Sequence, residues 1–102
     1  MTALFIIDGL PLEDRRAREA MRIAAGIGVW GKVQPILCFS RANDTVLGQA
    51  EDAELRRYIH LLSETAGGLF TQAPGEPGGL LRHTDEAGLA KLIDDADTVL
   101  RF

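Results

Sequence analysis

Short, continuous apolar runs that alternate with stretches of helical periodicity constrain the fold of this chain more than any other feature. Ala3–Ile7 reads ALFII and Val33–Phe39 reads VQPILCF, and neither run alternates between apolar and polar residues. A strand covered on only one face would alternate, so both runs predict strands covered on both faces, as in a parallel sheet. Leu69–Thr71, Leu80–Leu81 and Thr98–Phe102 are predicted as shorter strands.

Three segments between these runs carry apolar residues at steps of three and four, which places those residues on one face of a helix. The first helix is expected to end near Gly28–Gly31, with Glu13 and Asp14 in its first turn. The second spans Asp52–Ala66 and the third spans Asp85–Asp94. The expected apolar faces are Ala17, Ala20, Met21, Ala24 and Ile27 in the first helix, Leu55, Tyr58, Ile59 and Leu62 in the second, and Leu89, Leu92 and Ile93 in the third.

The alternation of strands and helices predicts an α/β protein. We expect a three-layer α/β/α domain with a mostly parallel sheet of four or five strands, formed by residues 1–102 as a single domain. Ser40–Gln49 and Ala73–Gly79 are polar or rich in Pro and Gly and are predicted as loops. A parallel crossover normally needs a dozen or more residues, so it stays open whether residues 79–82 form a strand.

Composition and charge narrow the classes of function. Fifteen acidic and eleven basic residues give a formal net charge of −4, which disfavours bulk binding to nucleic acid. One cysteine cannot form an internal disulfide, and no apolar run reaches the roughly 18 residues that suggest a membrane span. Without a recognisable signal peptide, the chain is expected to be cytoplasmic, with no direct nucleic-acid or membrane partner.

Polar residues at predicted strand ends are the candidate site. Ligands of an open parallel sheet bind beyond the carboxyl ends of its strands. The candidate pocket residues there are Asp8, Gly9, Ser40, Arg41, Asn43 and Thr71. Asp8 directly follows a strand, as the acidic group of a magnesium-dependent enzyme does, but Asp-Gly is also a common turn pair.

Cys38 is the candidate catalytic residue, but its position favours a packing role. It lies inside an apolar strand, and free cysteine is among the most buried residue types. A reactive thiolate needs partial exposure and a nearby positive charge, which Arg41 would supply. His60 and His83 lack further ligands at zinc-binding spacing, and the glycines form no nucleotide-binding motif. We therefore expect no metal and no cofactor.

Three segments resemble the DsrE/DsrF-like family. ALFIIDGLPLEDRRAREAMRIAAGIG resembles the family's opening strand, Gly- and Pro-containing loop and Ala-rich helix. ILCFSRANDTVL resembles its second strand and polar loop. LAKLIDDADTVLRF is similar to the carboxyl terminus of the TusC/DsrF branch, where a helix runs into an Asp-rich turn and a strand that ends in Arg-Phe.

This resemblance implies a subunit of a sulfur relay of the TusBCD type. Family members form small parallel α/β domains that assemble into trimers or hexamers with DsrE-like subunits. In the active subunits, a cysteine after the third strand carries a persulfide. The matching segment here, Phe70–Gly79, contains no cysteine. The resemblance therefore implies a homo- or hetero-oligomeric, non-catalytic subunit linked to intracellular sulfur transfer, and leaves an enzymatic role undecided.

Two other hypotheses stay open. One is a thiol-dependent sulfurtransferase or redox carrier that uses Cys38. The other is a divalent-metal hydrolase that uses Asp8, because ALFIIDG is similar to the first strand of PIN-like nucleases. Large apolar residues near predicted element ends, Val29, Trp30 and Phe102, either cover the core or mark a partner surface.

Overall fold

The computed structural model describes residues 1–48, 52–74 and 78–102. Within these residues, the strands are β1 (Thr2–Ile7), β2 (Gln34–Phe39), β3 (Gly68–Thr71), β4 (Arg82–His83) and β5 (Thr98–Arg101). The helices are α1 (Arg15–Trp30), α2 (Asp44–Gly48), α3 (Ala53–Thr65) and α4 (Glu86–Asp95).

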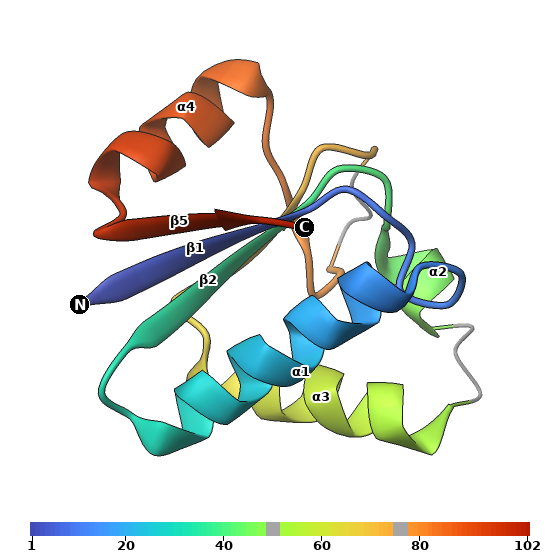
Figure 1. Ribbon diagram of the computed structural model, residues 1–102. Coiled ribbons are helices and arrows are strands. Elements are labelled where there is room, and N and C mark those ends of the chain that lie inside the picture. Colours follow the sequence, from blue (N-terminus) through green and yellow to red (C-terminus); the bar gives the residue numbers. More distant parts are fainter. Residues whose placement is uncertain (49–51, 75–77) are drawn as a thin grey trace.

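The strands form one sheet in the order β4-β3-β2-β1-β5, and every pair of neighbours is parallel. Helices α1 and α3 lie on one side of the sheet and α4 lies on the other (Figure 1). The predicted three-layer α/β/α fold is therefore confirmed, with a sheet of five parallel strands.

The position of β1 inside the sheet explains why its sequence is continuously apolar. Its odd-numbered residues, including Phe5 and Ile7, belong to the core beneath α1 and α3. Its even-numbered residues Leu4 and Ile6 belong to a second core beneath α4, together with Cys38. Both faces of β1 are buried, as expected for the inner strand of a covered parallel sheet.

The three longer helices begin at aspartate caps. Asp14, Asp52 and Asp85 each accept a hydrogen bond from a backbone N–H of the first turn, which satisfies a donor without an intrahelical partner. Helix α1 ends at Gly31, whose φ of 81° is the left-handed conformation that favours glycine. The predicted end of this helix is therefore confirmed, but Glu13 and Asp14 precede its first turn instead of lying within it.

Two predicted elements differ from the structure. The predicted loop Ser40–Gln49 contains the short helix α2 up to residue 48, and residue 49 lies outside the described residues. The fourth strand is Arg82–His83 instead of Leu80–Leu81, because the Leu80 and Leu81 amides donate hydrogen bonds to the Asp44 carboxylate and are held beside α2. Of the predicted loop Ala73–Gly79, residues 75–77 lie outside the described residues.

The predicted helix faces are correct for most positions. Leu89 of α4 is buried and Leu92 packs against the same core, whereas Ile93 is exposed, which corrects its predicted inward orientation. Only one helix covers this side of the sheet in the described part of the chain, so the buried face of α4 is narrow. No helix in the described ranges is long and apolar enough to cross a membrane.

Candidate carboxyl-edge site

Asp8 and Ser40 meet at the carboxyl edge of the sheet. The Ser40 Oγ hydroxyl donates a hydrogen bond of 2.6 Å to Oδ1 of Asp8. The Ser40 backbone N–H donates to the Ile7 carbonyl at 2.9 Å, which continues the β1–β2 pairing by one residue. The two side chains therefore lie next to each other because their strands pair in register.

Arg101 joins this pair from β5. Its Nε lies 3.9 Å from Oδ2 of Asp8, and both side chains are more than half exposed. An ion pair of such exposure contributes little to stability. Arg101 was missed as a site residue, because its contact depends on β5 lying beside β1, which the sequence pattern does not specify. The resulting Asp8–Ser40–Arg101 cluster is polar, open to solvent and without a buried charge.

Gly9 is buried and has a steric role. A Cβ at this position would lie 2.6 Å from the Cβ of Asp14, and it would also overlap the Asp14 carboxylate. Since that carboxylate caps α1, only a residue without a Cβ allows the chain after β1 to pass so close to the start of the helix.

Asn43 and Thr71 hold backbone groups of neighbouring loops. Asn43 Oδ1 accepts a hydrogen bond of 2.9 Å from the Val46 N–H in α2. Thr71 is fully buried, and its hydroxyl donates to the Ala42 carbonyl at 2.7 Å and accepts from the Ala73 N–H at 3.0 Å. These hydrogen bonds give Asn43 and Thr71 a structural role, because each side chain holds the backbone of a neighbouring segment. Arg41, in the same loop, is exposed.

Cys38 is completely buried, between β1, β3 and α4. Burial, and in second place the negative charge of Asp8, raise the pKa of the Cys38 thiol to about 11. The thiol is therefore protonated at neutral pH and shielded from solvent, which is the opposite of what a nucleophilic cysteine requires. These observations favour the packing role of Cys38 over the catalytic one.

The described residues contain no group of three or more His, Cys, Asp or Glu side chains that could hold a metal ion. His83 Nδ1 lies 2.9 Å from the Ala73 carbonyl, and His60 pairs with Glu64 one turn along α3.

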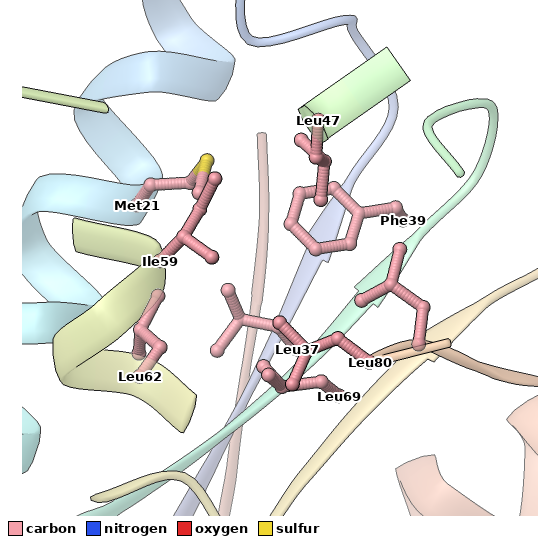
Figure 2. A pocket seen from close by; sticks show the side chains of 9 residues that line it. Met21, Leu37, Phe39, Leu47, Ile59, Leu62, Leu69 and Leu80 are labelled. Carbon is pink, nitrogen blue, oxygen red and sulfur yellow. The ribbon is translucent and has the colours of Figure 1, made fainter. Parts of the chain in front are cut away.

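A small apolar cavity lies between the sheet and the helices α1, α2 and α3, as Figure 2 shows. Its lining consists of Met21, Leu37, Phe39, Leu47, Ile59, Leu62, Leu69, Leu80 and Leu81. The cavity has a volume of about 10 Å³, which barely accommodates one water molecule, and it offers that water no polar partner. It is a packing gap, too small for an organic ligand.

Comparison with known proteins relates this geometry to one solved structure. No protein-family model and no curated protein matches the chain. The crystal structure of the YchN protein of E. coli matches it with a TM-score of 0.74 and 16% sequence identity, over 100% of both chains. The chain therefore has a DsrE-like fold over its whole length.

Proposed function

We propose that this chain is a small cytoplasmic DsrE-like subunit of an oligomer that serves intracellular sulfur transfer, and that it carries no persulfide itself. The observation that carries the proposal is the DsrE-like fold over the full length of both chains. The sequence resemblance to the TusC/DsrF branch points to the same assignment.

The position of the cysteine supports the non-catalytic role. The segment Phe70–Gly79, which follows the third strand, contains no cysteine. Cys38, the chain's single cysteine, is fully buried and has a raised pKa. The alternative of a Cys38-dependent sulfurtransferase gains no support from this geometry.

Exposed apolar side chains support assembly. Trp30 is 65% exposed and Val29 is 61% exposed at the end of α1. Such side chains on a small domain are typical of partner surfaces. Phe102 behaves differently: its ring stacks on Phe5 at a centroid distance of 5.9 Å, so it covers the core.

Sulfur loading and alkylation of the native protein test the non-catalytic role. After incubation with a low-molecular-weight persulfide donor, we expect intact-mass measurement to find no sulfane sulfur on the chain. We also expect slow alkylation of Cys38 by iodoacetamide. The control is the double variant Cys38→Ala, Ser63→Cys, whose new thiol replaces an exposed serine on α3 and should react rapidly. Retained sulfur on Cys38 would contradict the proposal.

Solution mass tests the assembly. We expect light scattering coupled to gel filtration to give a mass above that of one chain, for this chain alone or together with DsrE-like partners. A strict monomer that also binds no such subunit would contradict the oligomeric role.

A further inference from the structure

Among the residues that the structure describes, strand β5 forms an edge of the sheet and leaves a row of backbone groups without a strand partner. Its inner side pairs with β1, and the Phe102 N–H donates to the Ile6 carbonyl while the Phe102 carbonyl accepts from the Asp8 N–H. Because successive residues of a strand direct their N–H and C=O groups to opposite sides, the groups of Val99 and Arg101 point away from β1.

The side chains of β5 leave this edge open and apolar. Val99 pairs in register with Leu4, and so lies on the α4 side of the sheet, whereas Leu100 pairs with Phe5 and lies on the opposite side. Both remain partly exposed, at 40% and 37%. Natural sheet edges are often protected by charged side chains, Pro or a bulge; Thr98–Arg101 contains no Pro, and its single charged residue, Arg101, lies at its end and leaves the centre apolar.

The charges that flank the apolar centre of β5 are opposite in sign. Asp97 precedes the strand and Arg101 ends it, so the segment reads acidic, apolar, basic. Within the chain, Asp97 accepts a hydrogen bond from the Thr2 amide and Arg101 lies beside Asp8, but both side chains stay exposed to a second copy. If two copies of this segment pair in antiparallel fashion, each Asp97 lies opposite an Arg101. A parallel pair would place like charges together, which is unfavourable across strands. The segment is therefore complementary to itself in the antiparallel direction.

We propose that β5 pairs with β5 of a second copy of this chain across a two-fold axis at Val99. The two sheets then join, and Val99 lies opposite Val99 of the second copy. Thr98 lies opposite Leu100 of that copy. The Val99 N–H and C=O groups exchange two hydrogen bonds with their counterparts, as in a hydrogen-bonded antiparallel pair. The inference rests on the strand edge and names one contact of the assembly proposed above.

A lysine at the axis tests this pairing. The variant Val99→Lys places two positive charges opposite each other, and we expect the solution mass to fall by a factor of two. The matched control is Ile93→Lys, which places the same charge on the exposed side of α4 at a position 38% exposed. It should keep the wild-type mass. Circular dichroism and the thermal midpoint establish that both variants fold.

Disulfide trapping tests the register. In a Cys38→Ala background, Val99→Cys should form a covalent dimer under mild oxidation, because the Cα atoms of a hydrogen-bonded antiparallel pair lie about 5.5 Å apart. Leu100→Cys is the control and should stay reduced, since it faces Thr98 of the second copy. Trapping at position 100 instead of 99 would overturn the proposed register.

These outcomes separate the two proposals. An oligomer whose mass is unchanged by Val99→Lys would overturn the β5 pairing and leave the proposed assembly intact. Sulfane sulfur retained on Cys38 would contradict the non-catalytic role and leave the β5 pairing intact. A wild-type monomer without cross-linking at position 99 would overturn the β5 pairing directly.

Discussion

Gly9 and Gly26 show how differently one residue type can be constrained in the same molecule. A Cβ at Gly9 would overlap the side chain of Asp14. A Cβ at Gly26 would meet nothing within 4 Å, because this position lies on the exposed side of α1. Gly9 is therefore required by packing, whereas Gly26 only lowers the helical propensity of α1.

Alanine at these two glycines should shift stability in opposite directions. We expect Gly9→Ala to lower the free energy of unfolding by roughly 1–3 kcal/mol, as overpacking does, because the Asp14 cap must move. Gly26→Ala should raise the free energy by up to about 1 kcal/mol. Urea denaturation measures both, and a loss of stability in Gly26→Ala would show that its surroundings are not open.

The raised pKa of the Cys38 thiol leads to a second prediction at the residue scale, which concerns stability in alkaline solution. The thiol has a pKa near 9.0 when unperturbed and about 11 in the folded protein, so the unfolded chain releases this proton first. The contribution of the protonated thiol to the free energy of unfolding is therefore fully present below pH 9 and is lost as the pH rises from 9 towards 11. Between about pH 8 and pH 10.5, the wild type should lose on the order of 2 kcal/mol more than Cys38→Ala. An equal loss in both proteins would contradict the raised pKa.

At the scale of elements, the local sequence pattern was sufficient to predict the longer helices and strands but not the two short elements α2 and β4. The apolar runs and helical periodicity predicted β1, β2, α1, α3 and α4, because burial on one or both faces determines those patterns. Helix α2 was predicted as a loop because its five residues span little more than one turn and leave only Leu47 buried. Strand β4 was misplaced because its start depends on the distant Asp44 carboxylate.

This dependence on Asp44 can be measured. The variant Asp44→Ala removes the acceptor for the Leu80 and Leu81 amides, and we expect it to cost about 1 kcal/mol and to loosen the approach to β4. Hydrogen exchange should then accelerate at the Thr84 amide, which donates to the Thr71 carbonyl at 2.8 Å. Asp44→Asn retains an oxygen acceptor, so in this variant the Thr84 amide should exchange at nearly the wild-type rate. Equal exchange in Asp44→Ala would show that β4 forms without this contact.

At the scale of the whole molecule, strand order decides which site residues meet. Asp8 and Ser40 were both predicted at strand ends, and they meet because β1 and β2 are neighbours. Arg101 was not predicted, because its strand reaches the site only through pairing with β1 at the far end of the chain. Local periodicity contains no information about the neighbours of a strand, so the composition of the edge cluster required the three-dimensional fold.

Phe102 tests how the end of β5 contributes to the whole domain. Because its ring stacks on Phe5 in the core beneath α1, Phe102→Ala should lower the free energy of unfolding by roughly 2–4 kcal/mol. Phe102→Leu retains most of the apolar volume and should lose about half as much. Chemical denaturation measures both variants, and wild-type stability in Phe102→Ala would show that the ring contributes no packing.

The pairing of β1 with β5 also determines the order in which this protein can fold. The Thr2 amide donates a hydrogen bond to the Asp97 carboxylate across 95 residues of sequence, whereas β1, α1 and β2 follow one another directly. A β1–α1–β2 unit can therefore collapse early, while β1 keeps one bare, strongly apolar edge until the last strand arrives. Loop closure over such a distance is slow, and an unpaired apolar edge promotes aggregation. We therefore expect the chain to be most prone to aggregation before β5 docks.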